Sequence, residues 1–124
     1  MRKVIAAAVI EDKKILLVKK KETWILPGGK PEKRESDLEC LCREISEELS
    51  GSQLKPISFY GVFEGTSPHK KDIVNIYVYF ATITGNLKPS REIGDVRFVE
   101  DFNNYNLSEP ALKIISALRN DGYL

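Results

Sequence analysis

The segment from Gly28 to Gly51, GGKPEKRESDLECLCREISEELSG, constrains the fold of this chain more than any other stretch. Its apolar residues recur at the spacing of one helix face, which predicts an amphipathic helix over 36–49. Cys40 lies outside the apolar face described next, and we expect no structural role for it. The face that we expect to pack against the core carries Leu38, Leu41, Cys42, Ile45 and Leu49. A different face is left for solvent or for a ligand.

That other face carries three carboxylates. Glu44 lies three residues before Glu47 and four before Glu48, so the side chains are neighbours on a helix. Like charges at this spacing destabilise an exposed helix by roughly 0.2–0.5 kcal/mol per pair. A hard divalent cation such as Mg²⁺ reverses the sign, because it binds oxygen ligands. The pattern indicates either a metal site or an acidic, solvated helix face.

The loop before the helix has the composition of a ligand-binding turn. Gly28 and Gly29 follow Pro27, and glycine lets the backbone approach a ligand closely because it has no Cβ. Glu35 and Asp37 then place negative charge in the first helical turn, where the helix dipole favours it. This context favours the metal site.

The spacing of these residues resembles the Nudix box, the signature of the Nudix hydrolases. Reading from Gly29, five residues lead to Glu35 and seven more lead to Arg43-Glu44. Two further residues then lead to Glu47-Glu48. The helix of this motif is called the signature helix below.

The resemblance covers the whole chain and implies one domain over residues 1–124. It implies an α/β fold with α+β layering, namely an α/β/α sandwich around a mixed central sheet. The chain departs from the box only at its end, where Ser50 and Gly51 replace a glycine and an aliphatic residue. We expect Gly51 to adopt the left-handed conformation and to cap the signature helix.

The resemblance also implies a chemistry. Nudix hydrolases cleave a nucleoside diphosphate linked to another group, with Mg²⁺ as the cofactor and Mn²⁺ as an alternative. In this chain it implies that Glu44, Glu47 and Glu48 bind the metal, with the carbonyl of Gly29 as a further ligand. The three carboxylates and Arg43 are the expected catalytic residues. Arg43 lies off the acidic stripe, so we expect it to orient a carboxylate rather than bind substrate.

Three other residues have expected roles in or near this motif. Glu35 is expected to brace the loop against the helix, and Gly28 to have a structural role. Relatives often add a carboxylate from a later loop, and Glu92 is the candidate here; the alternative is plain surface charge. The general base is either Glu44 or Glu92.

The substrate is less constrained by the sequence. A MutT-like nucleoside triphosphatase fits the short chain best. Ser108 is expected to cap the last helix, where MutT has an Asn that reads the base. Trp24 and His69 are further candidates for substrate contact, with core packing and plain surface exposure as their respective alternatives. ADP-ribose hydrolases, dinucleoside polyphosphate hydrolases and a non-catalytic nucleotide-binding module remain open.

Between the first residues and the last helix, most of the remaining chain is predicted to form strands. Apolar or alternating runs predict strands at 4–10 and 15–18, joined as a hairpin, then at 54–64 and 73–83, with a last strand ending at Val99.

Composition excludes several classes of protein. With 124 residues and a net charge of +1, the chain is long enough for one core and has no global field for nucleic acid or membrane. Its two cysteines do not face each other on the helix, so no disulfide is expected. No signal peptide and no apolar stretch near the ~20 residues of a membrane helix are found. We expect a cytoplasmic protein with a small nucleotide as its partner, and a homodimer is possible.

Overall fold

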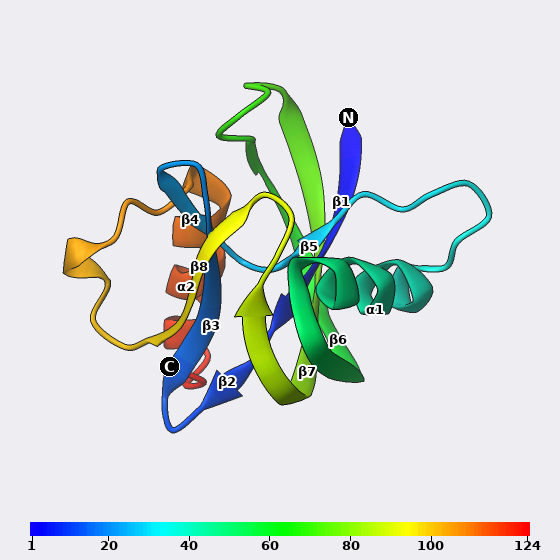
Figure 1. The fold of residues 1–124 in the computed structure, drawn as a ribbon. Helices are drawn as coiled ribbons and strands as arrows, with labels where there is room; N and C mark the ends of the chain where they lie inside the picture. Colours follow the sequence, from blue (N-terminus) through cyan, green and yellow to red (C-terminus); the bar gives the residue numbers. More distant parts are fainter.

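The computed structural model describes all residues from Met1 to Leu124. Two helices, α1 (Asp37–Glu48) and α2 (Glu109–Asn120), lie on opposite sides of two small sheets (Figure 1). A short 3₁₀ helix, η1 (Phe102–Asn104), precedes α2. Neither α1 nor α2 is long and apolar enough to cross a membrane.

The first sheet is mixed. Its strand order is β5 (Gly28–Gly29), β1 (Arg2–Ala8), β7 (Ile73–Pro89) and β6 (Leu49–Thr66). Strands β1 and β7 are parallel, whereas β1 with β5 and β6 with β7 are antiparallel. The predicted mixed α/β class is therefore confirmed.

The second sheet is antiparallel and contains β2 (Ile10–Glu11), β3 (Lys14–Lys20), β4 (Thr23–Ile25) and β8 (Ile93–Val99). The expected hairpin between 4–10 and 15–18 forms only at its turn, where Ile10 of β2 pairs with Ile15 of β3 and the Leu16 amide donates to the Val9 carbonyl. Strand β1 pairs with the distant β7 instead. A continuous apolar run indicates that a strand is buried on both faces, but it does not indicate which other strand pairs with it.

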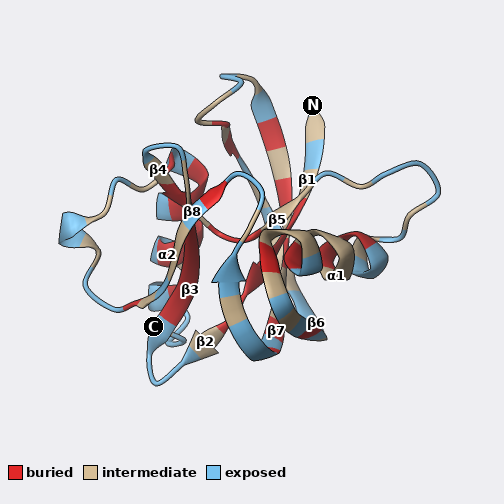
Figure 2. Ribbon diagram, in the orientation of Figure 1, coloured by how far each residue is buried: buried red, intermediate tan, exposed pale blue.

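The core has two halves, one under each helix. Alternate residues of β1 point to different halves, Ile5 and Ala7 toward α1 and Ala6 and Ala8 toward α2. Figure 2 shows the buried residues along the strands and on the inward faces of both helices. Fully burying an aliphatic side chain of this kind contributes about 1.5–3 kcal/mol. Both helices are therefore fixed to the sheets mainly by apolar packing.

The N-terminus of α1 is fixed by a capping box. The Ser36 hydroxyl accepts a hydrogen bond from the Glu39 amide, and the Glu39 carboxylate accepts one from the Ser36 amide. The predicted span 36–49 is confirmed to within a residue at each end.

The helix C-terminus differs from the expectation. Strand β6 begins at Leu49 without a loop, so Gly51 does not cap the helix. Gly51 does adopt a left-handed φ of 79°, but inside β6, where the register against β7 shifts between Ser50 and Ser52. Gly51 allows an irregularity in the strand, and that irregularity needs the same left-handed backbone conformation as a helix C-cap.

The buried face of α1 is rotated from the predicted one. Cys40 is completely buried, Cys42 is half-buried and Leu38 is 44% exposed. The helix leans toward β5, and the Cys40 thiol lies 3.6 Å from the carbonyl oxygen of Gly29. The two cysteines therefore exchange their expected roles.

Candidate active site

Strand β5 holds two of the three carboxylates of α1 against its glycines. The Gly28 amide donates a hydrogen bond of 3.1 Å to Glu48. The Glu44 carboxylate lies so close to Gly29 that a Cβ at this position would overlap it. Gly28 has a φ of 150°, and a Cβ there would overlap the backbone of Ile5 on β1. Gly28 therefore requires glycine because of its close approach to β1, whereas a side chain at Gly29 would displace the Glu44 carboxylate.

Arg43 donates hydrogen bonds to several carboxylates on and beside the acidic face. Its guanidinium donates to Glu35 at 2.6 Å, to Glu44 at 2.8 Å and to Glu47 at 3.1 Å. It also donates to the carbonyl of Lys30 in the preceding loop. The expectation that Arg43 lies off the acidic stripe is wrong, because its long side chain reaches back over the stripe. Its contacts are those of a residue that orients carboxylates.

Glu35 ties the loop to the helix. Besides the Arg43 contact, its carboxylate accepts a hydrogen bond of 2.8 Å from the Glu32 amide. The hydrogen bond from Arg43, followed by that from Glu32, lowers the pKa of Glu35 to about 2. The loop that carries β5 is therefore held by a charged pair as well as by sheet pairing.

The three helix carboxylates do not converge on one point in this structure. Glu44 and Glu47 both accept from Arg43, Glu47 also lies 3.4 Å from Arg91, and Glu48 turns toward Gly28. No three acidic, His or Cys side chains lie close enough together to hold a metal ion as they stand. The donor set itself, carboxylates beside a half-buried glycine backbone, fits a hard divalent cation. Binding would require these carboxylates to change their rotamers and converge on one point.

Glu48 differs from its neighbours in its surroundings. Burial, with a smaller contribution from the charge of Glu44, raises its pKa to about 8 against the opposing hydrogen bond from the Gly28 amide. Lys20 and Glu92 are both near enough to affect the same pKa. Residues from β3, from α1 and from the approach to β8 therefore meet around Glu48.

Glu92 is held by a lysine. Its carboxylate lies 3.0 Å from Lys20 Nζ, its side chain is 71% exposed, and the hydrogen bond from Lys20 lowers its pKa. The candidate carboxylate thus lies near the signature helix but is paired with a cation instead of pointing freely at the acidic face.

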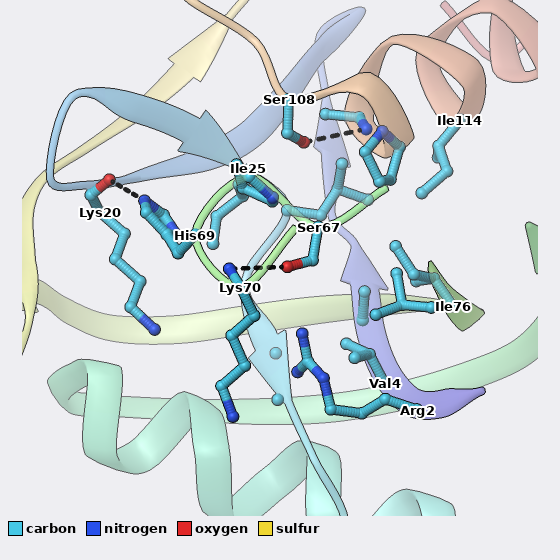
Figure 3. Close-up of a pocket in the computed structure, with 18 residues that line it drawn as sticks. Arg2, Val4, Lys20, Ile25, Ser67, His69, Lys70, Ile76, Ser108 and Ile114 are labelled. Atoms are coloured by element: carbon cyan, nitrogen blue, oxygen red, sulfur yellow. Dashed lines mark hydrogen bonds between the residues drawn. The ribbon is translucent and has the colours of Figure 1, made fainter. Parts of the chain in front are cut away.

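A pocket adjoins the acidic face. It has a volume of about 180 Å³ and is lined by β1, by the segment from β4 to β5, by the loop 67–70 and by the start of α2 (Figure 3). Gly28 and Gly29 belong to its wall and also contact the carboxylates. Much of the wall is apolar and includes Val4, Ala6, Ile25, Val74, Ile76 and Ile114.

Two of the three expected substrate-contact residues line this pocket. His69 lies on the loop side, where its Nε2 is 3.2 Å from the Lys20 carbonyl, and burial lowers its pKa. Ser108 lies on the α2 side. Trp24 is not in the wall: it packs in the core, edge-on to Tyr105 at 5.1 Å between ring centroids. Strand alternation turns Trp24 into the core and Ile25 toward the pocket.

Three basic residues of the pocket wall were not singled out by the sequence: Arg2, Lys20 and Lys70. Arg2 reaches the wall through the parallel pairing of β1 with β7, and it binds Asp72 with hydrogen bonds of 2.9 and 3.1 Å. The sequence does contain a run of three lysines at 19–21, but nothing in the run distinguishes Lys20 from its neighbours. In a sequence, a single charged residue at the end of a strand cannot be told from an ordinary solvated surface residue unless the register of the sheet is known.

Comparison with known proteins identifies the family. The NUDIX domain model matches residues 1–116. The solved structure of a UDP-X diphosphatase is 26% identical with a TM-score of 0.79, over 97% of this chain and 63% of that one. A MutT Nudix hydrolase from Burkholderia pseudomallei is 26% identical with a TM-score of 0.80, over 93% of this chain and 95% of that one.

An ADP-ribose pyrophosphatase from Streptococcus suis shares the fold at 19% identity and a TM-score of 0.75, over 98% of this chain and 92% of that one. Comparison with curated proteins gave no match. The chain belongs to the Nudix family, and the predicted class of enzyme, a Nudix hydrolase, is confirmed.

Proposed function

We propose that this chain hydrolyses the pyrophosphate of a nucleoside diphosphate linked to another group, with a nucleoside triphosphate as the first candidate. The observation that carries the proposal is the position of Gly28 and Gly29. Their backbone contacts the helix carboxylates and also forms part of the pocket wall. A ligand in the pocket would therefore place its phosphates beside the acidic face.

The acidic face supplies the metal ligands in this proposal. Glu44, Glu47 and Glu48, with the Gly29 carbonyl, would hold Mg²⁺ or Mn²⁺, which neutralises phosphate charge and activates water when bound. Arg43 keeps Glu44 and Glu47 in place before the metal arrives, because one guanidinium donates to both. Glu35 in turn fixes the guanidinium.

The pocket and its rim supply binding. The apolar wall accepts the base or another non-phosphate part of the substrate, since such surfaces gain from leaving water. Lys20, Arg2 and Lys70 place cations at the pocket, where they attract phosphate oxygens. In Figure 3 the Lys20 and Lys70 side chains extend toward the side where α1 lies. The base for water activation is Glu44 or Glu92.

A nucleotide panel tests the proposal. Nucleoside triphosphates, ADP-ribose and diadenosine polyphosphates are incubated with the protein and Mg²⁺, and the products are separated by chromatography. We expect cleavage within a pyrophosphate linkage and strict dependence on the metal. Preference for ADP-ribose or a dinucleotide would replace the triphosphate. Binding without turnover for every compound would indicate a non-catalytic module, which the intact set of carboxylates opposes.

A further inference from the structure

The turn between β7 and β8 is anchored to the C-terminal end of α1. The last carbonyls of a helix have no partner within the helix. Here the Ser90 hydroxyl donates to the Glu47 carbonyl, and the Ser90 amide donates to the Glu48 carbonyl at 2.9 Å. The Ile93 amide then donates to the Ser90 carbonyl at 3.2 Å and closes the turn. These bonds take the place of the helix-capping glycine that the end of the motif lacks.

The anchored turn holds Arg91 beside the acidic face. Arg91 has a left-handed φ of 57°. Its Nη2 lies 3.4 Å from Glu47 Oε2, although the arginine side chain remains 65% exposed. The next residue, Glu92, pairs with Lys20 of the pocket wall at 3.0 Å. The turn therefore contacts the acidic face through one charge and the pocket wall through the next.

Arg91 and Arg43 both contact the acidic face, but they are held with different firmness. Arg43 is only 22% exposed, is fixed by two hydrogen bonds to Glu35, and also donates to Glu44 and Glu47. Arg91 forms one ion pair, and exposed pairs of this kind contribute little to stability. Arg91 can therefore leave Glu47 at little cost, whereas Arg43 would have to break several bonds.

We propose that Arg91 is a phosphate-binding residue, which exchanges Glu47 for a phosphate of the substrate when Glu47 becomes a metal ligand. This inference rests on the proposed function. A guanidinium binds phosphate through two parallel, charge-assisted hydrogen bonds, which its present contact with Glu47 does not provide. A phosphate at the metal site would lie beside Glu47, where the exposed arginine side chain already is.

The exchange has a consequence for the order in which ligands bind. Without substrate, the charge of Arg91 competes with any cation for Glu47. With substrate, the phosphate occupies Arg91 and leaves the Glu47 carboxylate free to bind the cation. Arg91 thus weakens the binding of metal alone and strengthens the binding of phosphate with metal, so that one residue couples the two ligands.

The first measurement uses the metal alone. Binding of Mn²⁺ without nucleotide is followed by the loss of the electron paramagnetic resonance signal of free Mn²⁺. We expect Arg91→Gln to bind Mn²⁺ about two- to fivefold more tightly than wild type, since a cation beside Glu47 is lost. Lys88→Gln is the matched control, because it removes the same charge from an exposed residue of the preceding strand. It should bind Mn²⁺ as wild type does.

The second measurement adds a phosphate ligand that is not turned over. Imidodiphosphate is a pyrophosphate analogue whose bridging nitrogen resists hydrolysis, and titration calorimetry with Mg²⁺ measures its binding. We expect Arg91→Gln to weaken this binding about tenfold or more, because a charge-assisted contact with phosphate is lost. Arg91→Lys keeps the charge but lacks the planar fork, so its affinity should lie between the two. Lys88→Gln again serves as the control.

Ser90 tests whether the turn must be anchored. Ser90→Ala removes the hydroxyl that donates to the Glu47 carbonyl, whereas Ser90→Thr keeps a hydroxyl. We expect Ser90→Ala to weaken imidodiphosphate binding in the same direction as Arg91→Gln, and Ser90→Thr to bind as wild type does. Unchanged binding in Ser90→Ala would refute the anchoring role of the hydroxyl.

The outcomes separate the role of Arg91 from the proposed function. Opposite changes in Arg91→Gln, tighter for Mn²⁺ and weaker for imidodiphosphate, would not arise from a general loss of structure. Unchanged binding of either ligand in Arg91→Gln would overturn the proposal, even if the protein cleaves nucleotides. A wild-type protein that binds imidodiphosphate with Mg²⁺ but cleaves no nucleotide would instead refute the proposed hydrolysis and leave the role of Arg91 to the binding data.

Discussion

Arg43 explains how three adjacent glutamates can coexist on one helix before any metal arrives. Its guanidinium contacts Glu44 and Glu47 directly, and Glu35 holds its other edge. The planar fork of arginine allows these contacts at once, which the single ammonium of lysine cannot reproduce. The sequence indicated the carboxylates, but it did not show that their charge is partly neutralised from within the motif.

The first prediction concerns Glu35 and acid stability. Its folded pKa is lowered to about 2 from an ordinary value near 4.5, mainly by the hydrogen bond from Arg43. A depressed pKa stabilises the folded state above the unfolded pKa, and this contribution is lost as pH falls from about 4.5 to 2. Wild-type protein should therefore lose stability over this window more steeply than Glu35→Gln. Urea unfolding of both at several pH values measures the difference, and parallel curves would contradict it.

The second prediction concerns Glu92. If Glu92 serves as a metal ligand or as the base, Glu92→Gln should lower kcat by roughly 10²–10⁴-fold. Its stability should change by no more than about 0.5 kcal/mol, because the side chain is mostly exposed. Glu100→Gln, at another exposed glutamate, is the matched control. An unaltered kcat and pH profile in Glu92→Gln would leave Glu44 as the base.

At the scale of elements, the capping box decides how firmly α1 begins. The third prediction is that Ser36→Ala lowers the free energy of unfolding by about 1 kcal/mol, since a helix loses its N-cap. Ser36→Asp restores a capping oxygen and should recover most of that loss. Thermal melting of the three proteins provides the measurement. Equal melting temperatures for Ser36→Ala and wild type would show that the cap is dispensable.

The elements also show where sequence reasoning is limited. The signature helix and the last strand follow from local patterns, and the structure has them. The pairing of β1 depends on β7, and the burial of Cys40 depends on β5; both partners lie far away in the chain. The same holds for the pocket, because Arg2 and Lys70 join its wall only through sheet register and loop position. Local hydrophobic periodicity predicts neither the register of a sheet nor the position of a loop.

At the scale of the molecule, two sheets and two helices place a pocket and an acidic face on either side of one glycine pair. The fourth prediction is that Mg²⁺ or Mn²⁺ raises the melting temperature, because the cation binds the folded state only. At a hundred times the dissociation constant the gain is about 2.7 kcal/mol. KCl at equal ionic strength is the control for screening. No shift at millimolar metal would mean that the metal binds only together with substrate.

The most direct test of the account is Mg²⁺-dependent turnover of a nucleoside triphosphate by Glu48→Gln beside wild type. Glu48 is the carboxylate that Gly28 holds at the junction of acidic face and pocket. We expect the turnover rate to fall roughly a thousandfold or more, since a charged metal ligand is lost. We also expect the melting temperature without metal to stay the same or rise, because burial already disfavours the charged form of Glu48. Near-wild-type turnover in a folded Glu48→Gln protein would contradict it.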